Sequence, residues 1–178
     1  MRQREMAKLY EVRMEIDPKT GKDVRVAYYK GKYFTVDAAR KRRVTPVLWA
    51  AWALALAAFL TGGCTVNFGS RCPWVLPCYV CCMLPLFYLA MALWKVTRMG
   101  EVIDEVQKAD GLASALHAGA GLAVLGALWV AGDAVFLFTG TYLSLGMELL
   151  FLLCGAVTAA AGCVTAALMK GLPAAEKK

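Results

Sequence analysis

The sequence predicts an all-α membrane protein: a four-transmembrane-helix bundle with a small N-terminal cytosolic three-stranded antiparallel β-meander. Of its 178 residues, 60% are hydrophobic and only 19% are charged, which is too apolar for an ordinary soluble domain. The charged residues are also unevenly spread, because 13 of the 20 lysines and arginines lie within residues 1–43. Long uncharged runs follow that segment, and an alternating apolar pattern lies inside it.

The helices are predicted from four runs that lack Asp, Glu, Lys and Arg: 44–70, 72–94, 111–132 and 149–169. A hydrocarbon core of about 30 Å takes about 20 helical residues, and charges inside it are costly. We therefore expect a transmembrane domain over 44–170, with helices at 45–64, 74–94, 112–138 and 147–168. An amphipathic connector at 95–111 and a tail at 171–178 complete the prediction.

The remaining basic residues predict the orientation. Three lie in the connector 95–111, three follow Met169, and only Arg71 lies elsewhere. The positive-inside rule then places both termini and the connector in the cytoplasm. The first apolar run is expected to be a signal anchor, since a charged segment precedes it. Short loops without an N-x-S/T acceptor favour a bacterial inner or plasma membrane.

The net charge of +7 is concentrated beside the first helix. Arg40, Lys41, Arg42 and Arg43 are expected to meet the anionic headgroups of the lipid bilayer. A nucleic-acid partner is not expected, because acidic residues are interleaved with the basic ones and no RNP-type motif is present.

The meander is predicted within residues 1–43, where apolar and charged residues alternate as in half-buried strands. A turn containing Pro18 and Gly21 separates the first strand from the second, and Gly31 separates the second from the third. We expect the apolar residues of all three strands to form one partner-docking face: Tyr10, Val12, Met14, Ile16, Val24, Val26, Tyr28, Phe34 and Val36. Asp37 is expected to cap the basic helix that follows.

A meander this small needs a cover for its apolar face. The connector is one candidate, because Val96, Met99, Ile103 and Val106 recur at helical spacing. A second copy of the chain and a different protein are the alternatives, and the sequence leaves all three open.

Two rows of small residues predict close helix packing. The third helix has small residues four apart: Ala115, Gly119, Ala123, Ala127 and Ala131. The fourth has a stripe of them: Cys154, Gly155, Thr158, Ala159, Gly162, Cys163, Ala166 and Ala167. We expect these rows to pack the two helices together within one bundle, and association of subunits is the alternative.

Two acidic residues lie within or beside the predicted spans. Asp133 lies near the outer end of the third helix, and Glu148 begins the fourth. Intramembrane carboxylates are costly unless they are protonated, paired or beside water. They can form a structural ion pair with Arg71, the one basic residue of the outer loops, or they can form a proton or cation site.

Five of the seven cysteines surround the outer start of the second helix: Cys64, Cys72, Cys78, Cys81 and Cys82. Cys64 and Cys72 bracket a short loop on the oxidising side, where a disulfide can form. Cys78 and Cys81 form a C-x-x-C at a helix start, which can favour a thiolate. Buried cysteines in membrane proteins also act simply as small apolar residues.

With its Pro77, Cys78 and Cys81, and with its topology, the chain resembles the membrane disulfide-generating oxidoreductases, which pass electrons from thiols to quinone. The match covers about a tenth of the chain. The resemblance implies an exchanging thiol at Cys78 and a quinone-facing thiol at Cys81. The second outer loop lacks the family's other cysteine pair, so Cys64 and Cys72 would have to replace it.

No coherent catalytic signature accompanies these features, since the sequence has one histidine and no HExxH, Walker or GxSxG motif. Neither a metal nor a cofactor is expected, apart from quinone in the redox case. We therefore expect an accessory or scaffold subunit without catalysis of its own, bound to a protein partner or to further copies of itself. The alternatives are a small oligomeric proton- or cation-coupled transporter using Asp133 and Glu148, and a thiol-disulfide oxidoreductase using Cys78 and Cys81.

Overall fold

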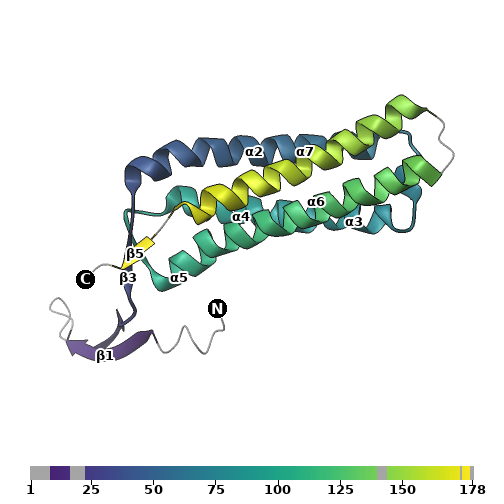
Figure 1. Cartoon of the computed structure of the whole chain (residues 1–178). Coiled ribbons are helices and arrows are strands. Elements are labelled where there is room, and N and C mark those ends of the chain that lie inside the picture. Colours follow the sequence, from purple (N-terminus) through teal and green to yellow (C-terminus); the bar gives the residue numbers. More distant parts are fainter. Residues whose placement is uncertain (1–8, 17–22, 140–143, 173, 177–178) are drawn as a thin grey trace.

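The computed structural model describes residues 9–16, 23–139, 144–172 and 174–176. Within them, four helical segments are long and apolar enough to span a membrane: Ala38–Cys64, Val75–Arg98, Glu105–Thr139 and Leu145–Lys170. They lie side by side as a bundle (Figure 1), which confirms the predicted fold of this multi-pass membrane protein. The strands lie at one end of the bundle, called the terminal end, and the other is called the loop end.

The first span, α2 (Ala38–Cys64), begins as the sequence predicts. The side chain of Asp37 accepts hydrogen bonds from the backbone N–H groups of Ala39 at 2.9 Å and Arg40 at 3.2 Å. The basic residues therefore occupy the start of the helix itself. Pro46 lies inside α2 and has no N–H to donate.

The second span divides into α3 (Val75–Cys81) and α4 (Met83–Arg98). The break at Cys82 has a local cause, because Pro85 cannot donate a hydrogen bond to the carbonyl of Cys81 four residues earlier. Both pieces still belong to one span of 24 residues.

The third span consists of α5 (Glu105–Gln107), the π-helical η2 (Lys108–Ala113) and α6 (Ser114–Thr139). The fourth is α7 (Leu145–Lys170), and its contact with α6 is the most extensive between any two elements. The small-residue rows therefore pack these two helices against each other within one chain, as expected.

Their crossing uses glycines at three levels: Gly119 against Thr165, Ala123 against Gly162, and Gly126 against Ala159. The predicted row of α6 leaves the contact beyond Ala123, and Ala127 and Ala131 are exposed. Residues four apart drift around a helix of 3.6 residues per turn, so Gly126 replaces them in the interface.

The first two strands form a hairpin, in which β1 (Tyr10–Ile16) pairs antiparallel with β2 (Asp23–Tyr29). Its register corrects the predicted docking face. Tyr28 pairs with Glu11, whereas Val12 pairs with Ala27. Directly paired residues share a face, so Tyr28 lies on the face opposite to Val12.

The other second-strand residues follow the same register, since Val24 pairs with Glu15 and Val26 with Arg13. The side chains of Ile16, Val24 and Val26 themselves lie outside the described part of the structure. A shift of one residue moves a whole strand to the other face. The partners of Val12 and Met14 in β2 are therefore Ala27 and Arg25, not Val24, Val26 or Tyr28.

The third strand also corrects the predicted meander. β3 (Tyr33–Val36) pairs with β4 (Val102–Asp104) on one side and with β5 (Ala174–Glu176) on the other, and not with β2. The connector 95–111 was predicted to be one amphipathic helix. Instead, α4 ends at Arg98 and the middle of the connector forms the strand β4. The predicted tail contributes β5.

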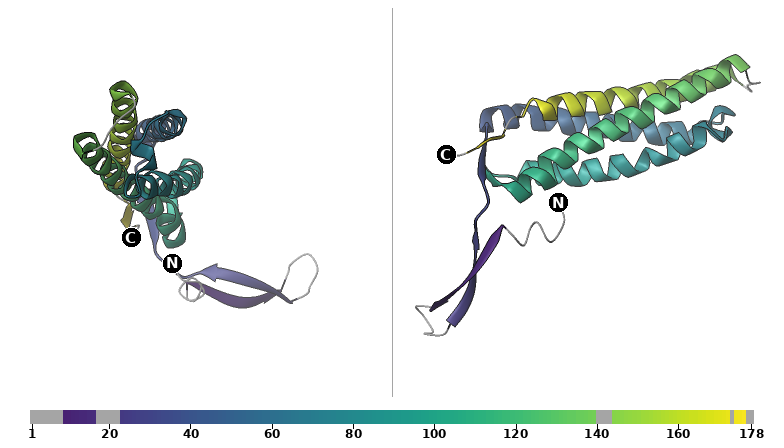
Figure 2. Two further views of the ribbon diagram at one scale, coloured as in Figure 1. Left: turned by 90° about the vertical axis from the view of Figure 1, so that its right-hand side faces the viewer. Right: turned by 60° about the horizontal axis from the view of Figure 1, so that its bottom comes forward.

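This three-stranded sheet covers part of its own apolar face against the bundle. Phe34 and Val36 are 9% and 6% exposed, and Ile103 is fully buried. The ammonium group of Lys108 lies 3.7 Å from the centre of the Phe34 ring. The chain thus covers the apolar residues of β3 itself, whereas the hairpin projects away from the helices (Figure 2).

Candidate functional site

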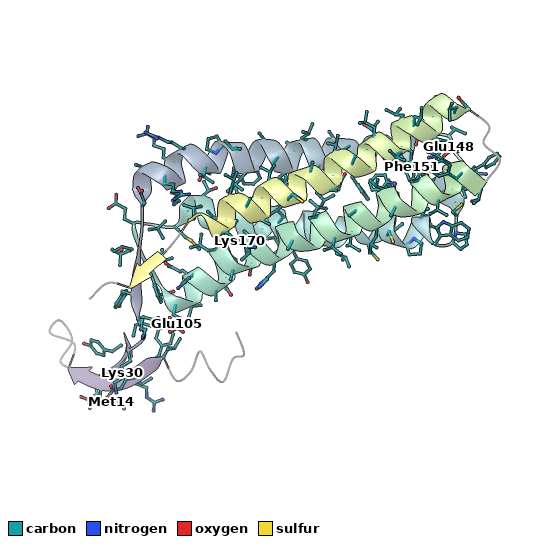
Figure 3. All side chains as sticks on the ribbon, viewed as in Figure 1. Met14, Lys30, Glu105, Glu148, Phe151 and Lys170 are labelled. Carbon is teal, nitrogen blue, oxygen red and sulfur yellow. The ribbon has the colours of Figure 1, made fainter. Side chains whose placement is uncertain are left out.

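Two acidic residues meet at the loop end of the bundle. Asp133 belongs to α6 and Glu148 to the first turn of α7, and both are fully buried. Figure 3 places Glu148 at this end, with Phe151 one turn further into the helix. The structure therefore brings together the two carboxylates that the sequence singled out.

Glu148 is held by backbone N–H groups of the loop between α2 and α3. The N–H of Phe68 donates to Oε1 at 2.7 Å, and the N–H of Gly69 donates to Oε2 at 3.2 Å. Glu148 thereby fastens this loop onto α7.

Asp133 has the opposite environment. Neither of its carboxyl oxygens has a hydrogen-bond partner among the described residues. The ion pair suggested for Arg71 is not formed, because Arg71 is exposed and its guanidinium lies 6.0 Å from the ring centre of Phe68. A buried polar group without a partner is costly, so Asp133 requires a further explanation.

Gly69 lies against both carboxylates. It belongs to η1 (Gly69–Arg71), and a β-carbon at this position would overlap Oδ1 of Asp133 and lie 2.8 Å from Oε2 of Glu148. Only glycine leaves this space free. The loop backbone can therefore approach both acidic side chains at once.

Asn67 precedes Phe68 in the same loop and is a further buried polar residue that the sequence analysis did not single out. It is 4% exposed, and both polar atoms of its side chain lack hydrogen-bond partners among the described residues. The available signal was its position as an uncharged polar side chain two residues before Gly69, in the loop that also carries Arg71.

Four aromatic rings close the bundle one turn below the carboxylates: Phe59, Tyr79, Trp129 and Phe151. Tyr79 lies at their centre, stacked on Phe59 with ring centres 4.7 Å apart, and it touches Trp129 edge-on at 4.9 Å. Its hydroxyl donates to the carbonyl oxygen of Phe59 at 3.0 Å. We call this group the aromatic cluster.

Below the aromatic cluster, the buried polar groups of α7 are already satisfied. The hydroxyls of Thr158 and Thr165 each donate to the carbonyl four residues earlier at 2.8 Å. Through the described part of one chain, the acidic residues are thus separated from the terminal end by aromatic and apolar packing.

All seven cysteines are free thiols in the structure. Cys64 is exposed and Cys72 is partly buried, and a bridge between them stays a prediction of the sequence. Burial raises the pKa of the Cys72 thiol, and the negative charges of Asp133 and Glu148 raise it further. Cys72 thus senses the charge of the neighbouring carboxylates.

The C-x-x-C residues lie on the bundle surface. The thiol of Cys78 donates to the carbonyl oxygen of Trp74 at 3.5 Å, and Cys78 lines an apolar hollow beside Leu128 and Val135. Cys81 is exposed. Their redox roles stay predictions, and the predicted roles of Arg40, Arg42 and Arg43 at the membrane surface do so too.

A groove of about 570 Å³ opens at the terminal end, between the start of α2 and the segment after α4. Lys41 closes one side of it by donating to the carbonyl oxygens of Thr97 and Met99. Trp49 donates to the hydroxyl of Thr97 at 3.1 Å. The basic start of α2 is thus fixed against α4.

The hairpin is attached to the rest of the chain through Tyr29. Its hydroxyl accepts a hydrogen bond from the N–H of Glu105 at 2.9 Å, and its ring lies between those of Tyr10 and Tyr33. Beyond this anchor, Val12 and Met14 are 62% and 64% exposed. This apolar row has no cover within the described chain.

Comparison of the chain with protein-family models, with curated proteins and with solved structures finds no match. Among the described residues, no three His, Cys, Asp or Glu side chains gather as a metal cluster. Within the described part of the chain, the exposed hairpin and the buried carboxylates are the two features that bear on function.

Proposed function

We propose that this four-helix membrane protein is a subunit of a membrane complex without catalysis of its own, and that the β1–β2 hairpin binds its protein partner. One observation carries the proposal. The row of Val12 and Met14 is largely exposed on a hairpin that projects from the bundle (Figure 2). Isolated two-stranded hairpins are marginally stable in water, so a partner that covers this row stabilises the hairpin.

The hairpin also offers unpaired strand edges, since its sheet contains only β1 and β2 among the described strands. An exposed edge can accept a strand from another protein, with backbone hydrogen bonds for affinity and side-chain pockets for specificity. An extended segment of a partner protein fits this edge and the adjoining apolar row.

The interior of the bundle supports a role other than transport by a single protomer. Ions that reached Asp133 would still have to pass the aromatic cluster and the apolar packing beneath it. A transporter built from one chain needs polar groups along its pathway. Transport therefore requires either an oligomer or a rearrangement of Trp129 and Phe151.

The proposal is tested by native mass spectrometry of the full-length protein extracted gently from its own membrane. We expect a stoichiometric partner chain with the wild type and its loss in the variants Val12→Lys and Met14→Lys. Val102→Lys is the matched control, because Val102 is an exposed strand residue at the same end of the bundle. It should leave the complex intact.

Two results would contradict the proposal. A partner retained equally by Met14→Lys and Val102→Lys would show that the hairpin is not the docking element. Catalytic or transport turnover by the purified protein alone would contradict the role of a non-catalytic subunit.

A further inference from the structure

We propose that the groove at the terminal end of the bundle binds one anionic phospholipid, with its phosphate at Arg42 and Lys41 and an acyl chain along Trp49. The groove lies between the start of α2 and the segment after α4, and its volume is about 570 Å³. The 27 residues of α2 extend about 40 Å, so its first turns lie beyond a hydrocarbon core of about 30 Å. The groove therefore lies at the depth of lipid headgroups (Figure 1).

The basic side chains of this groove can bind a phosphate group. Arg42 is exposed, and among the described residues its side chain has no ion-pair or hydrogen-bond partner. Its guanidinium offers a fork of N–H donors that matches a phosphate. Lys41 has three N–H donors and uses two on the carbonyls of Thr97 and Met99. Glu101 also lines the groove, which leaves an excess of one positive charge.

The wall below these charges is mostly apolar. Thr45, Pro46 and Trp49 follow Arg42 on the same face of α2, since they are spaced three and four residues apart. The indole N–H of Trp49 donates to the hydroxyl of Thr97 at 3.1 Å, which fixes the ring between α2 and α4. A site with a basic mouth and an apolar wall fits an amphiphile better than a free phosphate. Basic pockets between transmembrane helices bind the headgroups of anionic lipids.

A second hollow continues the apolar wall toward the middle of the membrane. Its volume is about 390 Å³, and its lining includes Trp49, Trp52, Ala90 and Met91 of α2 and α4. Trp49 thus lines both spaces. The ten residues from Arg42 to Trp52 rise about 15 Å, which is half of a hydrocarbon core of about 30 Å. An acyl chain of the same lipid can therefore lie in this hollow within one leaflet.

The neighbouring basic residues separate a built site from general attraction to a charged surface. Arg40 does not line the groove, and its guanidinium lies against the end of α7, where a β-carbon of Gly171 would be 2.7 Å from Nη2. Arg43 is exposed and does not line the groove either. Attraction by charge alone makes Arg42 and Arg43 equivalent, whereas a lipid held in the groove depends on Arg42.

The experiment is native mass spectrometry of the full-length protein in nonionic detergent, titrated with phosphatidylglycerol or with phosphatidylcholine. We expect the wild type to retain one phosphatidylglycerol at saturation and to bind phosphatidylcholine more weakly. Arg42→Gln should weaken the binding of phosphatidylglycerol about tenfold or more, because it removes a charge-assisted contact. Arg43→Gln is the matched control and should bind as the wild type does. Glu101→Gln should strengthen binding, since it removes the one negative charge of the lining.

A second pair of variants tests the acyl chain without changing any charge. Ala90→Phe fills the hollow between α2 and α4 and should weaken the binding of phosphatidylglycerol. Ala53→Phe is its control, because Ala53 is an exposed residue of α2 that does not line the hollow. Lys41→Gln also removes the contacts of α2 with the end of α4. Arg42→Gln breaks no such contact and is therefore the decisive variant.

Three results would overturn the proposal. The first is a wild type that retains no phosphatidylglycerol, or retains phosphatidylcholine equally well. The second is equal weakening by Arg42→Gln and Arg43→Gln, which would leave only attraction to a charged surface. The third is equal binding by Ala90→Phe and Ala53→Phe together with displacement of the lipid by glycerol 3-phosphate, which would reduce the site to a phosphate site without an acyl chain.

Discussion

Replacing Gly162 with alanine should force α6 and α7 apart, because backbone atoms of α6 lie where the new methyl group would be. A β-carbon there would lie 2.8 Å from the carbonyl oxygen of Gly119 and 2.9 Å from the Cα of Ala123. Ordinary van der Waals contacts of a β-carbon begin at 3.4 Å. The distance from the new β-carbon to the carbonyl oxygen of Gly119 must therefore increase from 2.8 Å to at least 3.4 Å, which moves the two helices apart. Overpacking of this kind costs about 1–3 kcal/mol.

The matched control is Gly121→Ala, also within the contact between α6 and its neighbours. A β-carbon at Gly121 would lie 3.8 Å from Cβ of Pro85, which is an ordinary contact. Both substitutions add the same methyl group inside a helix, so the gain in helix preference is similar in each. The difference between the two variants therefore isolates the steric conflict at Gly162.

The free energy of unfolding can be measured by steric trapping in bilayers or by titration with SDS in mixed micelles. We expect Gly162→Ala to be less stable than Gly121→Ala by about 1–3 kcal/mol. Equal stabilities would refute the close crossing of α6 and α7, because no backbone would then have to move.

Three further predictions concern the loop end and the hairpin. Tyr29→Phe removes the hydroxyl that accepts the N–H of Glu105, so hydrogen exchange in β1 and β2 should accelerate by an amount that corresponds to about 1 kcal/mol; unchanged exchange would exclude Tyr29 as the anchor. The raised pKa of Cys72 means less thiolate at a given pH, so its alkylation profile should lie at higher pH than that of a free thiol. Asp133→Asn removes one negative charge and should shift this profile toward lower pH; an unshifted profile would separate Cys72 from the carboxylate. Gly69→Ala places a methyl group against Asp133 and should destabilise the bundle by about 1–3 kcal/mol, and wild-type stability would contradict the packing of this loop.

Local sequence patterns were sufficient to predict the transmembrane spans, the first strand and the cap of the first helix. Runs without charge predicted all four spans, because a charge in hydrocarbon is costly wherever the helix packs. Alternation over Tyr10 to Ile16 predicted a strand, and Asp37 was placed correctly as a helix cap. Each of these features is encoded within a few neighbouring residues.

The candidate site was only half visible in the sequence. Asp133 and Glu148 stood out because acidic residues are rare beside membrane spans. Arg71 seemed to be their partner by elimination, yet it is exposed and its guanidinium lies over the ring of Phe68. Asn67 and Gly69 have no charge to attract attention, and their importance comes from the approach of their loop to two helices.

Which strands pair with each other, and in which register, could be read only from the three-dimensional structure. The observed pairing of β1 with β2 is shifted by one residue from the pairing that the predicted docking face requires. Alternation of apolar and polar residues cannot specify this shift, because each strand alternates in the same way in either register. β3 pairs with β4 and β5, which are each three residues long and lie far along the chain. Pairing of this kind depends on where the bundle brings the ends of α4 and α7, and no local sequence pattern contains that information.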